Sequence, residues 1–435
     1  MMKCFNKLLT IISITLVNII IVSCSSNSQN TEVINKNNTP HKVETIKLMT
    51  SWGGVDSKTG VLKEIIANFE DENPNIKILN QSIFGDDYLP TLKKEIASGN
   101  EPDVFGLWPG TDIKYLIEAD KIADITDTLK EDRAWMDSFN PSSFSSTTFN
   151  NRIYGIPLEI VFEGLFINKD LFDKYGVKEP ANYKELKDAV TIFKKNKIIP
   201  IAYNSTAEGS YLYQNMIASI GGSEGVEKYI VNGKINKCYI DAMKYMKELN
   251  DMGAFSEDSN MIYSDERNEL FISKQAAMTV QGSWFVTYFG KDDESVKMIP
   301  FPSMTDDDSK MLTGLGAGTF YICKSAWDSF NKKDNCINFL KFLTSKETAT
   351  FLYKKTGLIN SLNMDMGFLP AYSKLAKQSA NVYKMTQAKN KTPIPDLVIE
   401  RSVWEDIVIK NFPKFLLGKT TAEEIWNQAI EKINN

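Results

Sequence analysis

The chain has 435 residues, of which 43% are hydrophobic and 24% are charged, and its formal net charge is −5. This composition is typical of a globular protein, and the length predicts two or three domains or one large α/β unit. The acidic balance and the lack of a basic stripe exclude binding to a nucleic-acid backbone. A single histidine, His41, argues against His-based catalytic triads and multi-His metal sites. We therefore expect no nucleic acid, no metal and no cofactor.

The N-terminus carries a targeting signal. Lys3 and Lys7 precede an apolar run from Leu8 to Val22, which is shorter than the ~20 residues of a bilayer span and ends at Ser23 and Cys24. The pattern resembles a bacterial lipoprotein signal peptide, with residues 1–23 removed and Cys24 lipidated. The alternative is an uncleaved anchor. Residues 24–43 are polar and predict a flexible tether.

Alternating strand and helix patterns follow. The sequence predicts a strand over Thr45–Met49, a Gly-rich loop, an amphipathic helix over 61–75, a strand over 76–83, a helix over 86–100 ending at Gly99, and a strand over 102–108. Short loops between such elements indicate a parallel sheet with helices on both faces.

The same alternation continues to the C-terminus. Strand patterns occupy 152–160, 164–172, 198–204 and 276–286. Helical patterns occupy 183–197, 335–357 and 420–433. The pattern at 335–357 indicates two helices that meet near Ser345, the second capped by Gly357. The pattern at 420–433 begins with a threonine cap. We expect an α/β fold whose ligand site lies where the carboxyl ends of the strands open onto a crevice.

The five cysteines show no CxxC spacing, so no zinc knuckle or redox motif is indicated. One disulfide among Cys238, Cys323 and Cys336 is possible by count. The alternative is that all three are small buried residues, and we favour it.

Several segments together resemble a known family. They are "SWGG", "FEDENPNIKI", "LKKEIASGNEPDVF", "YGIPLEIVFEGLFINKDLFDKYGVKEPANYKEL", "ISKQAAMTVQGSW" and "GLGAGTFYICKSA". In order and spacing they resemble the extracellular solute-binding proteins of bacterial carbohydrate ABC importers, the family of maltose-binding protein. The resemblance covers the chain from Thr45 to its C-terminus.

The resemblance implies a two-lobed, periplasmic-binding-protein-like (type II) flytrap with discontinuous lobes and a hinge. We place the first lobe at 44–158 with 316–360 and the second at 159–315 with 361–435. It further implies a monomeric lipoprotein, held at the extracellular side of the cell membrane through Cys24, that passes a carbohydrate to the permease subunits of an ABC transporter. No catalytic residue is expected.

A sugar has apolar ring faces and a rim of hydroxyls, so its site needs flat aromatic side chains and planar amides or carboxylates. Trp52 follows the first strand on a Gly-flanked loop, and Asp56 lies four residues later. Trp108 ends the third strand, where family members contact ligand. The strand-end rule places these three residues at the crevice. Asp103 begins the same strand and is better explained as a turn cap.

The middle of the chain supplies polar candidates. Glu159 and Glu163 lie in the apolar run "PLEIVFEGLF", where a carboxylate needs a reason to be buried. We favour Glu159 as the one that binds hydroxyls. Asn204 and Tyr211 flank a loop after the strand at 198–204 and are the other candidates here.

The last candidates depend on the resemblance. Trp284 in "QGSW" matches the family's best-known stacking position, and Trp404 in "ERSVWEDI" matches a second one. Gly316 suits a close approach of the backbone to a ligand, or else a hinge turn. Arg401 either binds hydroxyls or pairs with Glu405 one helical turn away.

Two other functions remain open from the sequence. A protein of the same fold can bind a non-sugar solute, and a secreted glycosidase needs only two suitably spaced carboxylates. A site lined by cationic groups would favour an anionic solute, whereas the tryptophan candidates favour a sugar.

Overall fold

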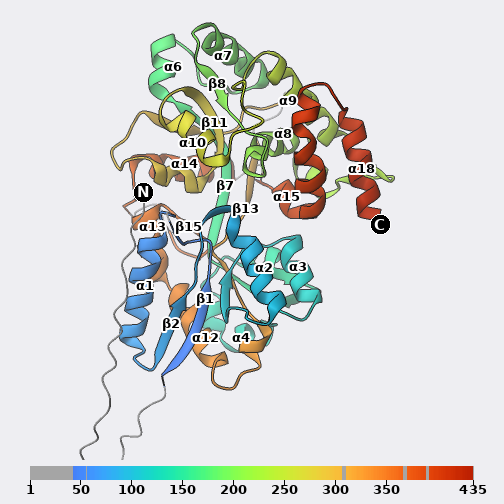
Figure 1. Ribbon diagram of the computed structural model, residues 1–435. Coiled ribbons are helices and arrows are strands. Elements are labelled where there is room, and N and C mark those ends of the chain that lie inside the picture. The colour runs from blue at the N-terminus through green and yellow to red at the C-terminus, as the bar shows by residue number, and fades with distance from the viewer. Residues whose placement is uncertain (1–42, 55, 306–309, 366–369, 388–390, 435) are drawn as a thin grey trace, which may run out of the picture. The chain divides into compact units, whose positions relative to one another are not determined.

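The first of two main sheets is built from strands that are far apart in the sequence (Figure 1). The computed structural model describes residues 43–54, 56–305, 310–365, 370–387 and 391–434. The strand order is β2-β1-β3-β14-β6, with bounds β1 Glu44–Met49, β2 Ile76–Asn80, β3 Val104–Gly106, β6 Gly155–Pro157 and β14 Thr319–Ile322. β1 is parallel to β2 and β3, whereas β14 is antiparallel to β3 and β6. The predicted β-α-β-α-β series is confirmed.

Helices cover both faces of this sheet. Successive side chains of β1 point to opposite faces, and apolar side chains on each face pack against a helix. Ile46 and Leu48 pack in one cluster with α1 and with Phe339, while Met49 packs in another with α2. The predicted C-cap of α2 is confirmed, since Gly99 has φ 76°. The helices of this lobe are α1 Thr59–Glu72, α2 Tyr88–Ser98, α3 Thr111–Glu118, α4 Thr126–Glu131, α5 Arg133–Met136, α11 Lys324–Trp327, α12 Lys333–Leu343 and α13 Lys346–Thr356.

The second sheet is organised around one long strand, β7 (Glu159–Asn168). The first residues of β7 pair with β13 and β15, and its later residues pair with β11 and β12. The main order is β16-β13-β7-β11-β8, with bounds β8 Ile199–Ala202, β11 Ala276–Gly282, β12 Val296–Ile299, β13 Met311–Leu315, β15 Ile359–Asn360 and β16 Lys391–Thr392. The predicted strands at 152–160 and 164–172 were wrong in their bounds, because β7 runs through the gap between them and α6 begins at Lys169.

The second lobe is rich in helices. They are α6 Lys169–Tyr175, α7 Tyr183–Lys195, α8 Tyr211–Glu227, α9 Lys237–Asp251, α10 Ser264–Ile272, α14 Lys374–Gln387, α15 Pro395–Val398, α16 Arg401–Val403, α17 Phe412–Leu416 and α18 Ala422–Asn434. A π-helical turn spans Trp404–Val408. Short 3₁₀ segments lie at Gly85–Asp87, Pro141–Thr147, Glu208–Ser210, Ser283–Tyr288 and Ile409–Asn411. Two-stranded ribbons pair β4 Thr148–Phe149 with β5 Arg152–Ile153, and β9 Ile230–Val231 with β10 Lys234–Ile235.

Several predicted caps are confirmed. The Ser345 hydroxyl accepts the backbone N–H of Thr348 at 3.1 Å and starts α13, and Gly357 ends it with φ 75°. Before α18, Thr421 and Glu424 form reciprocal side-chain to backbone hydrogen bonds of 3.1 and 2.9 Å. Local sequence therefore determined where these helices begin or end.

Cys238, Cys323 and Cys336 are buried free thiols, so no disulfide joins them. Burial raises the pKa of the Cys238 and Cys336 thiols to about 12, which keeps them protonated. Within the described ranges, no helix is long and apolar enough to cross a membrane and no acidic, Cys or His cluster could hold a metal ion. The signal peptide, Cys24 and the tether lie outside the described residues. The lobe boundaries at 158, 315 and 360 stay predictions.

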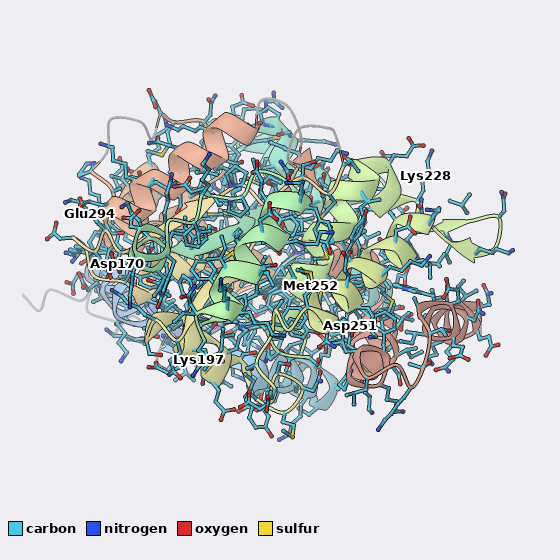
Figure 2. All side chains as sticks on the ribbon, turned by 90° about the horizontal axis from the view of Figure 1, so that it is seen from above. Asp170, Lys197, Lys228, Asp251, Met252 and Glu294 are labelled. Atoms are coloured by element: carbon cyan, nitrogen blue, oxygen red, sulfur yellow. The ribbon has the colours of Figure 1, made fainter. Side chains whose placement is uncertain are left out.

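The surface of the second lobe carries charges of both signs (Figure 2). Asp170 pairs with Lys274 at 2.5 Å, Glu294 with Lys374 at 2.6 Å and Lys228 with Glu224 at 2.8 Å. Such exposed pairs contribute only about 0–1 kcal/mol each. Their alternation of sign makes this a surface suited to water rather than to a polyanion.

Candidate functional site

The loop after β1 places Trp52 beside a buried charge pair. Trp52 is only 1% exposed and packs edge-on against Phe320, with ring centroids 5.7 Å apart. Its indole Nε1 is buried and has no hydrogen-bond partner among the described residues. The ammonium of Lys58 lies 5.5 Å from the Trp52 ring centroid. The ring is therefore packed into the core of the first lobe, with one donor left without a partner among the described residues.

Lys58 was missed from the sequence, and it connects two predicted residues. Its Nζ lies 3.6 Å from Glu159 Oε1 and 4.0 Å from Asp56 Oδ2. Burial works to lower the pKa of Lys58, but the carboxylates of Glu159 and Asp56 outweigh it and raise that pKa. Lys58 is therefore a buried ammonium whose ion pairs are longer than direct hydrogen bonds.

Glu159 is held by backbone from the other side. The N–H of Gly318 donates to Glu159 Oε2 at 2.8 Å, and the N–H of Gly316 donates to the Glu159 carbonyl at 2.9 Å. A Cβ on Gly316 would lie 2.6 Å from Glu159 Oε2. The close approach for which Gly316 is needed is thus to Glu159. Any contact between Gly316 and a ligand stays a prediction.

An aromatic group belongs to the second lobe. Tyr211, the first residue of α8, lies edge-on to Trp284, with centroids 5.7 Å apart. Tyr288, at the end of the same 3₁₀ segment as Trp284, is 45% exposed and was not singled out from the sequence. Burial raises the pKa of Tyr288, and the carboxylates of Glu208, Asp265 and Asp56 add to the effect. Asp56 lies on the loop after β1, so its carboxylate is close enough to Tyr288 to influence that hydroxyl electrostatically.

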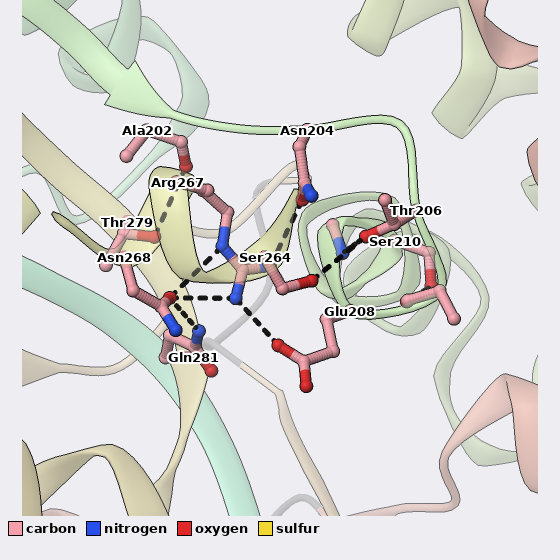
Figure 3. A network of polar contacts seen from close by, with 12 residues as sticks. Ala202, Asn204, Thr206, Glu208, Ser210, Ser264, Arg267, Asn268, Thr279 and Gln281 are labelled. Carbon is pink, nitrogen blue, oxygen red and sulfur yellow. Dashed lines mark hydrogen bonds and ion pairs between the residues drawn. The ribbon is translucent and has the colours of Figure 1, made fainter. Parts of the chain in front are cut away.

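Asn204 lies in a polar network centred on Arg267 (Figure 3). The amide Nδ2 of Asn204 donates to the Ile262 carbonyl, and its Oδ1 accepts from Arg267 Nη1, both at 3.3 Å. Glu208 Oε2 accepts from Arg267 Nη2 at 2.9 Å. The sequence singled out Asn204 as a candidate ligand contact, which stays a prediction, and the arginine that it bonds comes from α10, 63 residues further along the chain.

Glu163 and Asp396 form a second buried polar group. Asn215 Nδ2 donates to Glu163 Oε2 at 2.7 Å, and Gln214 Nε2 donates to Asp396 Oδ2 at 3.1 Å. Burial and the nearby charge of Asp396 raise the pKa of Glu163 well above its usual range, against the Asn215 hydrogen bond, which lowers it. Burial also raises the pKa of Asp396. The fold therefore favours the neutral form of both groups.

We expect Glu163→Gln to stabilise the protein at neutral and alkaline pH. The folded-state pKa of Glu163 is raised, so its contribution to stability is complete below the unfolded pKa of about 4.3 and is lost as the pH rises through the folded value. Gln can still accept from Asn215 and does not titrate. Thermal unfolding at pH 4, 6 and 8 should show a higher Tm for the variant at pH 8 and no difference at pH 4. The exposed Glu118→Gln is the control, and equal Tm values for Glu163→Gln and wild type at pH 8 would contradict the assignment.

Trp108 contacts an arginine from the other lobe. The guanidinium of Arg401, on α16, lies 5.4 Å from the Trp108 ring centroid, and its Nε donates to Asp112 Oδ2 on α3 at 2.8 Å. Arg401 also donates to Glu405, as one of the two sequence interpretations expected. Lys93 Nζ donates to Asp112 Oδ1 at 2.6 Å. Trp108 and Arg401 are thus brought together, although neither was predicted to contact the other.

Trp404 lies in the packed core of the second lobe. It is 1% exposed and stacks on Tyr213, with centroids 5.6 Å apart and planes 13° apart, and its Nε1 reaches the Ser210 hydroxyl at 3.4 Å. The Trp404 ring stacks on Tyr213 and its Nε1 already has a partner, whereas the equally buried Trp52 has an Nε1 without a partner among the described residues, so we leave Trp404 out of the proposed site. Asp103 accepts from the Lys47 N–H at 2.8 Å and from Lys332 at 2.9 Å, which supports its interpretation as a structural residue.

Comparison with known proteins identifies the family. The model of the family described as bacterial extracellular solute-binding protein matches residues 56–350, more than half of the chain. The chain belongs to this family. The matched range contains every site residue discussed above except Trp52, Asp396, Arg401 and Trp404.

Curated relatives of this solute-binding protein cover most of its length. The multiple sugar-binding protein of Streptococcus mutans is 24% identical over 308 residues, which span 68% of this chain and 70% of the relative. The melibiose/raffinose/stachyose-binding protein MelE of Bacillus subtilis is 20% identical over 364 residues, 81% of this chain and 80% of the relative. Both relatives are named as binding proteins.

Solved structures show the same fold. A protein from a study of xylan utilization by Caldanaerobius polysaccharolyticus has a TM-score of 0.78 and 25% identity, covering 90% of this chain and all of that chain. A chitin oligosaccharide binding protein has a TM-score of 0.77 and 20% identity, covering 89% of this chain and 98% of that one. The solute-binding protein thus has the two-lobed type II architecture that the sequence predicted, with one sheet in each lobe.

The residues that were missed share a physical reason. Lys58, Arg267, Tyr288 and Asp112 lie in ordinary amphipathic or polar segments, so nothing local distinguishes them from surface residues. Only Lys58 could have been suspected from the sequence, because it follows Asp56 by two residues on the loop that was predicted to bind ligand. The other three are functional candidates because of where the fold brings them.

Proposed function

We propose that this solute-binding protein captures a sugar or oligosaccharide between its lobes and delivers it to the permease of an ABC importer. The observation that carries the proposal is a pair of chemically complementary groups. The Trp52 loop contributes an indole, the buried ammonium of Lys58 and the carboxylate of Asp56, to which β7 adds the carboxylate of Glu159, and the second lobe contributes Tyr211, Trp284 and Tyr288. Aromatic faces and planar polar groups are what sugar rings and their hydroxyls require.

The proposed ligand set is Trp52, Asp56, Lys58, Glu159, Asn204, Glu208, Tyr211, Trp284 and Tyr288, with Trp108 and Gly316 at its margin. Contacts from both lobes form together only when the lobes approach each other, so ligand binding favours the closed state. The curated relatives that bind named sugars support this class of ligand. The alternative of an anionic solute is disfavoured, because Asp56, Glu159 and Glu208 outnumber the cations Lys58 and Arg267.

The location belongs to the same proposal. A lipid anchor on Cys24 would hold a monomeric protein on the extracellular side of the membrane, within reach of the permease. The extracellular family supports this location at the coarser level. The anchor itself rests on the sequence around Cys24. Palmitate labelling of the full chain, lost in Cys24→Ala, is the check on it, and undiminished labelling of that variant would overturn it.

Calorimetry and thermal shift tests with raffinose, stachyose, maltotriose, chitotriose and xylotriose test the proposal. We expect at least one of these sugars to bind and to raise Tm. At a concentration of 100 times its Kd, the bound sugar should increase the free energy of unfolding by about 3 kcal/mol. Inorganic phosphate and spermidine serve as anionic and cationic non-sugar controls. If only a control binds, the site takes a non-sugar solute. Release of reducing ends from the sugars would indicate a glycosidase instead.

A further inference from the structure

Arg267 is a fully buried cation that needs an explanation. It lies on α10 in the second lobe, is 1% exposed and is among the largest fully buried side chains of the described chain. A buried charge is strongly unfavourable unless hydrogen bonds and an opposite charge compensate it. Its partners therefore indicate what its burial achieves.

Those partners come from two segments, α10 itself and the segment after β8 (Figure 3). Nε and Nη2 donate to the Asn268 side-chain oxygen on the same helix at 3.2 and 2.9 Å. Nη1 donates to Asn204, which follows β8, at 3.3 Å, and Nη2 donates to Glu208 at 2.9 Å. Asn268 also accepts from Gln281 on β11 at 2.9 Å, which holds the near side of the guanidinium in place. The planar fork of arginine is what allows one side chain to reach all three oxygens.

Asn204 and Glu208 lie on one tight segment that leads into Tyr211. A Cβ on Gly209 would lie 1.7 Å from the Asn204 carbonyl, so the segment folds closely on itself. The Ser205 hydroxyl donates to Asn260 at 2.7 Å and anchors the outer edge of the segment. The guanidinium of Arg267 is the charged centre of this arrangement and links the segment to α10.

Only one oxygen of the Glu208 carboxylate takes part in this network. Its Oε2 is bonded to Arg267, but its side chain is 37% exposed and Oε1 accepts no hydrogen bond from the residues described here. The charge of Glu208 also acts on Tyr211 and Tyr288, raising the pKa of both together with burial. Glu208 is therefore an oriented acceptor with one oxygen free, three residues before Tyr211 of the aromatic group.

We propose that Arg267 is a positioning residue of the solute site, which fixes the 204–210 segment and aims the free oxygen of Glu208 at a hydrogen-bond donor of the solute. This inference rests on the proposed function. A neutral sugar hydroxyl supplies such a donor, whereas an ionised carboxylate does not. Arg267 itself stays buried behind Glu208 and Asn204 and acts through them.

Arg267→Lys is the first test, because lysine keeps the charge but cannot reach all three oxygens. Hydrogen–deuterium exchange of the full chain without solute should show faster exchange at amides 204–210. The Kd for whichever of the five sugars above binds the wild type should rise about tenfold or more. The matched control is Arg152→Lys, an exposed arginine of the first lobe that pairs with Asp124, and it should change neither quantity.

A double-mutant cycle with Glu208→Gln separates positioning from a purely structural role. If Arg267 acts through Glu208, Glu208→Gln weakens binding in the wild type but adds little in the Arg267→Lys background. Fully additive losses, an unchanged Kd in Arg267→Lys, or unchanged exchange at 204–210 would each overturn the inference. A wild type that binds none of the five sugars would instead refute the proposed function, and the exchange result would still decide whether Arg267 orders the segment.

Discussion

Trp404→Ala is expected to lower the free energy of unfolding by about 3–5 kcal/mol, the usual cost of removing a large buried aromatic side chain. Trp404 is enclosed by the second-lobe core, stacks on Tyr213 and lies 6.4 Å from the ring centroid of Trp426. Its removal leaves a cavity that these rings can only partly fill. Denaturant unfolding monitored by circular dichroism measures the loss, together with the Kd of the folded variant for the sugar that binds the wild type.

Trp284→Ala is the matched comparison. Trp284 is only partly buried and meets Tyr211 edge-on, so its loss should cost little stability but should weaken sugar binding by about tenfold. The two tryptophans should thus separate, one affecting stability and the other affinity. A Trp404→Ala protein with wild-type stability and lost sugar binding would restore the role that the sequence resemblance implied for it.

Asp112→Ala is expected to destabilise the protein by about 1–3 kcal/mol, because it removes the buried carboxylate that accepts hydrogen bonds from Arg401 and Lys93, while Arg401 keeps its pair with Glu405. Asp112 is buried on α3 and joins Lys93 to Arg401, whose side chain is 23% exposed. The contact connects the region of Trp108 in the first lobe to α16 in the second. Differential scanning calorimetry at neutral pH measures the effect.

The effect of Asp112→Ala should depend on pH in a defined direction. Burial works to raise the pKa of Asp112, but Arg401 and Lys93 outweigh it and hold that pKa below its usual 3.8. A depressed carboxylate pKa contributes stability above the unfolded value, and that contribution is lost as the pH falls through the folded value. The difference between variant and wild type should therefore be present at pH 7 and diminish below about pH 4. The exposed Asp137→Ala, which loses only the surface pair with Arg133, is the control. A pH-independent difference would mean that packing, not charge, is responsible.

The polar core around β7 has a consequence for how this fold can work. β7 carries Glu159, which faces Lys58, and Glu163, which faces Asn215, so one strand contributes a buried carboxylate to each of two networks. Buried polar groups require specific partners. Their arrangement therefore specifies one packing of the chain more than it adds stability. A single hydrogen-bonded strand, β7, therefore joins the two networks.

The chain order of strands, helices and caps was largely determined by local sequence. Apolar spacing in "VLKEIIANF" specified the buried face of α1, and Gly99, Ser345 and Gly357 specified helix ends through their backbone preferences. These signals are local, because periodicity and capping involve residues within one or two turns. The composition and the order of the matched segments likewise indicate the solute-binding family from the sequence alone.

Tertiary structure alone decided which candidate residues share a site. Trp404 and Trp284 both read as aromatic candidates, yet the fold encloses the first and leaves the second beside Tyr211. Arg267 and Lys58 read as ordinary helix and loop charges, yet one lies behind Asn204 and Glu208 and the other between Asp56 and Glu159. The reason is that burial and ion pairing depend on contacts between residues tens to hundreds of positions apart. Local patterns specify the element that carries a side chain, but the packing of those elements determines what that side chain meets.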